Sequence, residues 1–357
     1  MPEFAQFPDV ELDRKTEATV NATLAALTAG TPAEEALRQL SGAAIDAFVE
    51  WAAGRMQQQI PAVAARRRDD EARITRRWGA ALDAYYAVTV AAAEIAMLAS
   101  RHSPVGQGSS DSVTAALTLL HARTCQTSFE VHTLLAAGFP GGAYSRYRTL
   151  HELAVTAAVI AQYGRRPAHA DLADRYLSHG SIEHCRQAEE RQRTGRELGW
   201  QPIPDSAMKE LKKLHDALIV RYGPDYSQPY GWATGLLGRH PNFAKLEAKA
   251  DMAYLRYLYV TGSHLIHASA HGLRLTVLDL GSANSDVFIK PSDTGLAQPA
   301  EASLNALIDV TGGLVLHGGE KLDASPVYLN FLGLHELRRR AVSLFYEAED
   351  QGSTQDT

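Results

Sequence analysis

Along most of the chain, apolar residues recur at intervals of three and four positions, with polar residues between them. This spacing places the apolar side chains on one face of an α-helix. No stretch alternates apolar and polar residues for long enough to build a sheet. The pattern predicts an all-α multi-helix bundle, with helices near 42–64, 66–101, 112–137, 143–163, 168–199, 205–221, 242–275, 300–317 and 325–349.

The breaks between these helices predict the domain organisation. The segment "RHSPVGQGSSDS" (101–112) combines Pro, Gly and Ser, and Asp111 or Ser112 is expected to cap the helix that follows. Two further stretches, 222–242 and 280–300, are long enough to be irregular loops, and loops of that length often bind ligands. We therefore expect an N-terminal helical arm (1–102), a helical core domain (111–280), a loop with closing helices (281–349) and a disordered tail (350–357).

Composition and charge restrict the class of protein. The 357 residues are 45% hydrophobic and 21% charged, with a net charge of -6, which is typical of a globular chain. This charge gives no general attraction to nucleic acid. The two cysteines, Cys125 and Cys185, form no CxxC, and the first residues show no secretory leader. The apolar run 88–99 is shorter than the ~20 residues of a membrane span. We expect a cytoplasmic protein without a membrane segment.

The segment "YSRYRTLHELAVTAAVIA" (144–161) carries charged groups into an apolar helix. Arg148, His151 and Glu152 share one face at about 100° per residue, and Arg148 and Glu152 are spaced i,i+4. Such groups near a core need a satisfied network. Two interpretations stay open: a buried structural bridge, or a polar pocket with perturbed pKa values.

A second cluster of candidate residues lies in "YLRYLYVTGSHLIHASAHG" (254–272). A helix through this segment places His264, His267 and His271 on one face, with Ser263 one turn from His267. A zinc site is conceivable, but the sequence has no H-E-x-x-H, and we predict neither a metal nor a cofactor. His267 is the better candidate for a general acid or base. Core packing accounts for the three tyrosines, Tyr254, Tyr257 and Tyr259.

A third candidate is "DLADRYLSHGSIEH" (171–184), which places Tyr176 and His179 on neighbouring turns together with Arg175 and Glu183. A solvated charged face explains this spacing as well as a binding site does.

Several of these segments together resemble the bacterial domain of unknown function family 5677. They are "LLAAGFPGGAYSRYRTLHELAVTAAVI", "LADRYLSH", "YGWA" and "YVTGSHLIHAS", within residues 112–280. The resemblance implies a helix with an R-x-x-x-E step, here Arg148 and Glu152, and a late S-x-x-x-H helix, here Ser263 and His267. It also implies that Tyr176 and Trp232 lie in matched segments. The family name implies no activity.

The segment "RYRTLH" also resembles the R-x(4–6)-H motif of HEPN-type ribonucleases, helical domains of toxin and antiphage systems. That resemblance implies metal-independent RNA cleavage with Arg146 and His151. On a regular helix, however, the two side chains diverge by about 140° unless the helix begins after Arg146.

These observations support three hypotheses. In the first, the protein is a metal-independent ribonuclease: His151 or His267 takes the 2′-hydroxyl proton, Arg148 or Arg146 stabilises the phosphorane, and the basic stretch 64–77 holds RNA. In the second, a non-catalytic sensor binds a small polar or anionic ligand. In the third, the polar cluster is purely structural. The candidate catalytic residues are Arg148, His151, Glu152 and His267, and the candidate ligand-binding residues are Tyr144, Arg146, Tyr176, His179, Trp232 and Ser263. We also expect a homodimer through the N-terminal helices.

Overall fold

The computed structural model describes residues 32–102, 111–267, 269–277, 291–317 and 326–353, together with residues 18, 21, 22 and 25. No β-strand occurs in these ranges, so the predicted all-α fold is confirmed. The longer helices are α2 (Ala33–His102), α3 (Ser112–Ala136), α4 (Pro140–Tyr163), α5 (Leu172–Thr194), α6 (Asp205–Tyr222), α9 (Arg256–Ile266), α11 (Ala297–Leu316) and α12 (Pro326–Ser353).

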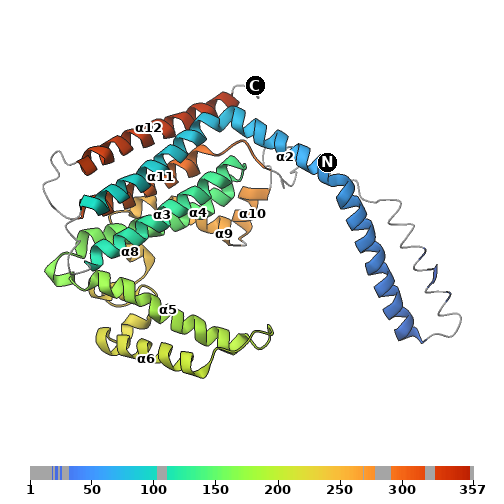
Figure 1. Ribbon diagram of the computed structural model, residues 1–357, viewed down its shortest axis with the longest axis horizontal. Coiled ribbons are helices and arrows are strands. Elements are labelled where there is room, and N and C mark those ends of the chain that lie inside the picture. Colours follow the sequence, from blue (N-terminus) through green and yellow to red (C-terminus); the bar gives the residue numbers. More distant parts are fainter. Residues whose placement is uncertain are drawn as a thin grey trace. The chain divides into compact units, whose positions relative to one another are not determined.

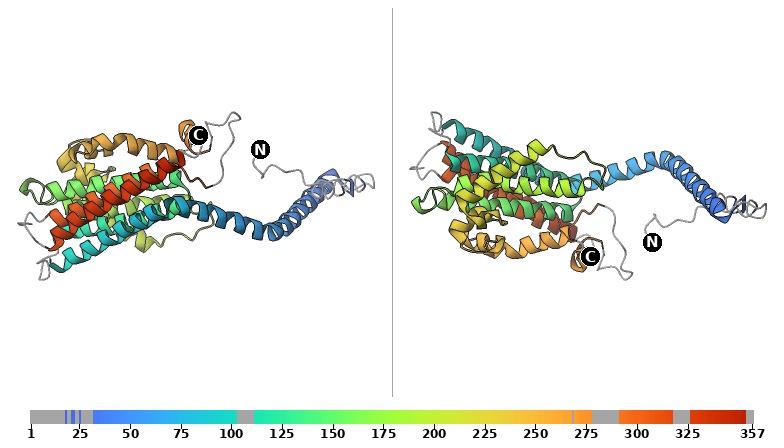
Figure 2. Two further views of the ribbon diagram at one scale, coloured as in Figure 1. Left: turned by 90° about the horizontal axis from the view of Figure 1, so that it is seen from above. Right: turned by 90° about the horizontal axis from the view of Figure 1, so that it is seen from below.

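The chain forms two compact units, Met1–Arg73 with Val277–Ile289 and Ile74–Thr276 with Lys290–Thr357. This division differs from the predicted domains, in which the arm ended at residue 102 and the closing helices stood apart. The reason is that the second half of α2 is part of the larger unit's core. Trp78 and Tyr85 are fully buried, and Trp78 packs on Phe345 of α12 with ring centroids 5.9 Å apart. Figure 2 shows α12 running alongside this part of α2.

Helix α2 is continuous, whereas two helices were expected, and it contains Pro61. Of the described residues, one stretch, Gln59–Ala99 in this helix, is long and apolar enough to cross a bilayer by length and composition. Its second half supplies Trp78, Tyr85 and Val88 to the core of the larger unit. Core helices of bundles commonly have this composition.

Helix α4 is the centre of the larger unit. It packs against α3, α9 and α11, and α11 in turn packs against α12 (Figure 1). The face of α4 toward α11 has small side chains, and a Cβ added at Gly313 would lie 3.8 Å from the Ala157 carbonyl oxygen. Small residues on facing helices let the two backbones approach closely. Helices α5 and α6 pair with each other beside this core.

The start of α3 confirms one predicted cap. Asp111 is the N-cap residue, and its carboxylate accepts a hydrogen bond from the Val113 amide at 3.2 Å. Arg165, which follows α4, pairs with the same carboxylate. Asp111 therefore ties the beginning of α3 to the end of α4.

The region 222–275 differs from the prediction of a loop followed by one long helix. The expected loop 222–242 contains the short turns η3 (Pro224–Ser227), η4 (Gly231–Ala233) and α7 (Thr234–Leu237). The expected helix 242–275 is divided into α8 (Phe243–Lys249), η5 (Ala253–Leu255), α9 and α10 (Ala270–Val277). The compact turns hold aromatic side chains in place, and Tyr226 and Trp232 are both buried.

Two predictions concern residues near the C-terminus. Most of the expected loop 280–300 lies outside the described residues, and residues 291–296 are irregular, as a loop would be. The tail that was expected to be disordered from residue 350 continues α12 as far as Ser353, and residues 354–357 lie outside the described residues.

A buried histidine connects α3 to α11. His121 is 3% exposed, and its Nε2 lies 3.1 Å from Thr311 Oγ1, whose hydroxyl donates to the Leu307 carbonyl at 2.7 Å. The hydroxyl oxygen is therefore the acceptor, and Nε2 carries the proton. The Cys125 Sγ lies 3.7 Å from Nδ1. Burial lowers the pKa of His121 from 6.5 to about 4.

We expect the stability of the fold to fall between pH 7 and pH 5 because of His121. Below pH 6.5 the unfolded chain binds a proton at this residue, whereas the folded chain does not until the pH approaches about 4. The loss at pH 5 is about 2 kcal/mol for this residue. Urea unfolding at pH 7 and at pH 5 measures this loss of unfolding free energy. In His121→Gln the difference between the two pH values should be smaller than in the wild type by about 2 kcal/mol.

The control is His184→Gln, which changes an exposed histidine of α5. Its unfolding free energy should follow the wild-type pH dependence. A His121→Gln variant with the full wild-type pH dependence would contradict this account of the α3–α11 contact.

Candidate functional site

A close contact between α4 and α9 forms the site. Gly262 lies against α4, where an added Cβ would be 2.9 Å from the Tyr144 carbonyl oxygen and 3.3 Å from Arg148 Cβ. One turn earlier on α9, the hydroxyl of Tyr259 accepts a hydrogen bond from Arg148 Nη2 at 3.0 Å and donates to Glu152 Oε1 at 3.0 Å. The two helices are therefore antiparallel here, and a glycine permits the approach.

The ring of Tyr259 lies near two guanidinium groups. The Cζ atoms of Arg148 and Arg256 are 5.0 Å and 5.5 Å from its centroid. Arg148 also pairs with Glu152 at 3.2 Å, as their i,i+4 spacing predicted. Both side chains remain partly open to solvent, at 26% and 37% exposure. We call Arg148, Glu152, Tyr230, Tyr259 and Arg256 the Tyr259 cluster.

Tyr230 joins the cluster from the turn before η4. It has a left-handed backbone conformation, with φ 59° and ψ 18°, which is uncommon for a bulky residue and costs about 1 kcal/mol. Burial, together with the negative charge of Glu152, raises the pKa of Tyr230 to about 12. Burial also raises the pKa of Tyr259. Both phenols keep their protons at neutral pH and remain hydrogen-bond donors.

His151 lies directly beneath this cluster and is sealed from solvent. Its side chain and that of Glu247 in α8 are each 1% exposed, and Nε2 lies 2.9 Å from Glu247 Oε1. The other oxygen of Glu247 pairs with Arg256. Burial lowers the pKa of His151 although Glu247 opposes the shift, so the imidazole is neutral and donates to the carboxylate. The imidazole ring also packs against the rings of Phe243 and Tyr259, with centroids 5.8 Å and 5.7 Å away.

Arg146 does not join His151. It lies 2.7 Å from Glu130 of α3, on another face of α4. The helix begins at Pro140, so both residues lie on a regular helix and diverge as the spacing requires. Tyr144 is also part of the core at 9% exposure, and burial raises its pKa.

The late histidines do not meet Arg148 and Glu152. Helix α9 ends at Ile266, and His267 is its exposed C-cap residue, about 12 Å along the helix axis from Tyr259. The Ser263 hydroxyl donates to the Tyr259 carbonyl at 2.9 Å, and His264 packs on His271 with ring centroids 5.1 Å apart. Within the described ranges, no group of three or more metal-ligating side chains gathers.

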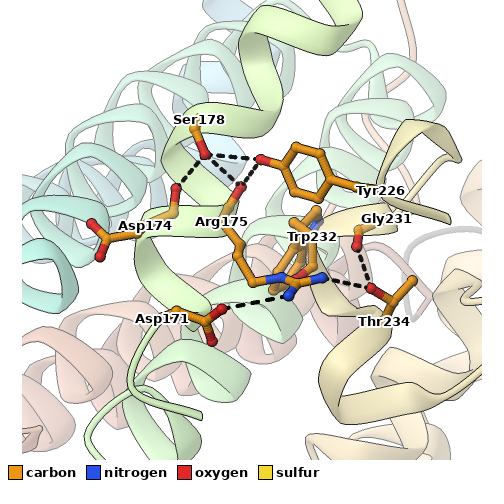
Figure 3. A network of polar contacts seen from close by, with 8 residues as sticks. All are labelled: Asp171, Asp174, Arg175, Ser178, Tyr226, Gly231, Trp232 and Thr234. Atoms are coloured by element: carbon orange, nitrogen blue, oxygen red, sulfur yellow. Dashed lines mark hydrogen bonds and ion pairs between the residues drawn. The ribbon is translucent and has the colours of Figure 1, made fainter. Parts of the chain in front are cut away.

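The third predicted cluster, on α5, holds the turns η3 and η4 against that helix (Figure 3). Arg175 Nε donates to the Trp232 carbonyl at 3.2 Å, and its Nη2 donates to Thr234 Oγ1 at 2.8 Å. His179 Nε2 lies 3.1 Å from the carbonyl oxygens of both Tyr226 and Gln228. These contacts are internal, so Arg175 and His179 have structural partners rather than open surfaces.

Two predicted ligand-binding aromatics pack on each other behind these contacts. Tyr176 and Trp232 form an edge-to-face pair with centroids 5.1 Å apart. Burial is the main cause of the raised pKa values of both Tyr176 and Tyr230. The negative charge of Glu183, on the same helix as Tyr176, contributes to both.

Sequence reasoning missed Glu247, Arg256, Tyr230 and the polar role of Tyr259. Of the three tyrosines assigned to core packing, Tyr254 and Tyr257 are 77% and 74% exposed. Only Tyr259 is buried, and its hydroxyl is the centre of the network. The sequence does place Gly262 one turn after Tyr259, on the same helix face. A small residue at such a position indicates a close contact between two helices, and this spacing could have identified Tyr259.

The fold and the site define an all-α bundle protein whose partly exposed Arg–Tyr–Glu cluster rests on a buried carboxylate. Residues 114–284 match the model of a family of unknown function, DUF5677. This match confirms the resemblance expected over 112–280. No curated protein and no solved structure matched the sequence.

Glu247→Ala should lower the free energy of unfolding by about 3 kcal/mol, because it leaves a buried imidazole without its acceptor and Arg256 without its counter-charge. Urea denaturation at neutral pH measures this loss.

Glu183→Ala is the matched control, since that carboxylate is 58% exposed and lies 3.7 Å from His179. Its expected cost is about 0.5 kcal/mol. If both variants lost the same stability, the His151–Glu247 contact would not be the support of the site that we describe.

Proposed function

We propose that this protein is a non-catalytic binding module that recognises a small ligand with an anionic group at the Tyr259 cluster. The observation that carries the proposal is the position of the Tyr259 ring near two partly exposed guanidiniums. Arg148 is 26% and Arg256 45% exposed. Guanidinium groups present planar, paired donors that match carboxylate and phosphate oxygens.

The surrounding groups support recognition of a small polar molecule. Glu152 and the hydroxyl of Tyr259 hold Arg148 in one orientation, so fewer rotamers are lost when a ligand binds. Tyr230 adds an aromatic face and a donor from a strained turn, and strained residues concentrate at ligand contacts. The cluster combines an anion-binding group with a neighbouring apolar surface.

The positions of the histidines favour binding over RNA cleavage. A general base must come within hydrogen-bond distance of the proton it removes. His151 is enclosed and already donates to Glu247, and His267 lies at the far end of α9. The geometry therefore supports the sensor hypothesis better than the ribonuclease hypothesis.

We expect an anionic probe to raise the melting temperature of the full chain. Inorganic phosphate, acetate and adenosine monophosphate are suitable probes, because they share the anionic group and differ in the attached surface. A probe at a hundred times its Kd adds about 2.7 kcal/mol of stability, which corresponds to about 4 °C for a chain of this size. Arg148→Gln should abolish the shift.

Arg146→Gln is the matched control, because Arg146 lies two residues earlier on α4 but pairs with Glu130. That variant should keep the full shift. The proposal fails if no probe distinguishes wild type from Arg148→Gln, or if purified protein cleaves RNA and the cleavage is lost in His151→Ala.

A further inference from the structure

The first half of α2 carries an uncovered apolar stripe. Its five members, each at least half exposed, are Ile45 (62%), Val49 (56%), Met56 (67%), Ile60 (56%) and Val63 (50%). At about 100° per residue they fall within an arc of about 60° on the helix. Their steps of four, seven, four and three residues follow a coiled-coil seam with one stutter in its heptad pattern. We call these five residues the α2 stripe.

The two sides of this helix differ. Trp51, about 140° from Met56 around the helix, is only 8% exposed, whereas the stripe is open along its whole length. A single helix in water gains little stability from its own hydrogen bonds, and most helices in proteins depend on a packed apolar face. Five aligned large side chains also form a contiguous surface of the kind that marks an interaction site.

The charges beside the stripe have opposite signs at its two ends. Asp46 and Glu50 are exposed near the first end, and Arg66, Arg67 and Arg68 are exposed just past the last, ahead of the acidic residues 69–71. Arg67 is 81% exposed and pairs along its own helix with Glu71, at 2.8 Å. A parallel copy of this helix would place like charges together. An antiparallel copy places the acidic end beside the basic end, twice per dimer.

We propose that the α2 stripe pairs with the same stripe of a second copy of this chain in an antiparallel coiled coil. Met56 lies near the two-fold axis, and the residues around Val49 face those around Val63 of the other copy. Such an interface is isologous, so it closes at two chains. This inference is independent of the ligand site, which lies in the other compact unit.

The first test is the mass of the full chain in solution by sedimentation equilibrium. We expect twice the 38.8 kDa of one chain. Val49→Glu with Met56→Glu should raise the dimer dissociation constant at least tenfold. Gln57→Glu is the matched control, because Gln57 is exposed beside Met56 but outside the stripe, and it should leave the constant unchanged. Unchanged circular dichroism would show that the variants fold.

The second test determines the orientation of the pair. Val49→Cys and Val63→Cys are prepared separately, mixed and treated with a short bis-maleimide, with wild type as background because Cys125 and Cys185 are buried. An antiparallel pair gives the mixed product. Self-linked Val49→Cys would indicate a parallel pair, since an antiparallel one separates these sites by about 20 Å.

Three results would overturn the proposal. One is a chain that stays monomeric at all concentrations, which would assign the stripe to other residues of the same chain. Another is a dimer that Val49→Glu with Met56→Glu does not weaken. The third is the parallel cross-link.

Discussion

The buried contact between His151 and Glu247 is the interaction on which the site depends. A carboxylate enclosed at 1% exposure is unfavourable unless hydrogen bonds and an opposite charge compensate for lost hydration, and here His151 and Arg256 do both. Because these partners come from α4, α8 and the first turn of α9, one carboxylate specifies how three elements meet. Apolar packing alone accepts several such arrangements. The direction of Arg256, and with it one of the two guanidiniums beside Tyr259, follows from this contact.

The same contact determines what chemistry the cluster can do. A histidine becomes useful for proton transfer when it can exchange protons with a bound molecule near neutral pH. Here the burial that makes the His151–Glu247 contact strong also keeps the imidazole neutral and lowers its pKa. The partly exposed groups, Arg148 and Glu152, carry opposite charges and are held in place by the Tyr259 hydroxyl. The stability beneath the cluster and the recognition that we propose above it rest on one arrangement, so the structural and binding interpretations of the sequence are compatible.

Most helices were predictable from the sequence because apolar spacing and caps are local signals. Asp111 caps α3 as expected, and the i,i+4 spacing of Arg148 and Glu152 predicted their pairing. The predictions were wrong where contacts between residues far apart in the sequence determine the structure. His267 was expected beside Arg148 on the assumption of one unbroken helix over 242–275, but α9 ends at Ile266. Glu247 gave no local sign of burial, because its partner His151 is far away in sequence. The two compact units divide after Arg73 rather than at the expected boundary at residue 102, because Trp78 and Tyr85 of α2 are core residues of the larger unit.

The family segment does not enclose its own core. Helix α4, which carries the cluster, is covered by α3 and α9 from within residues 114–284, but its remaining face is covered by α11, which lies outside the match. Ala157 meets Gly313 there, and His121 of α3 reaches Thr311 of the same helix. Without α11, the apolar face of α4 and a buried imidazole would both be open to water. In this chain, helices from both sides of the family segment complete the bundle, and α4 can carry charged residues on one face because α11 supplies apolar cover on another.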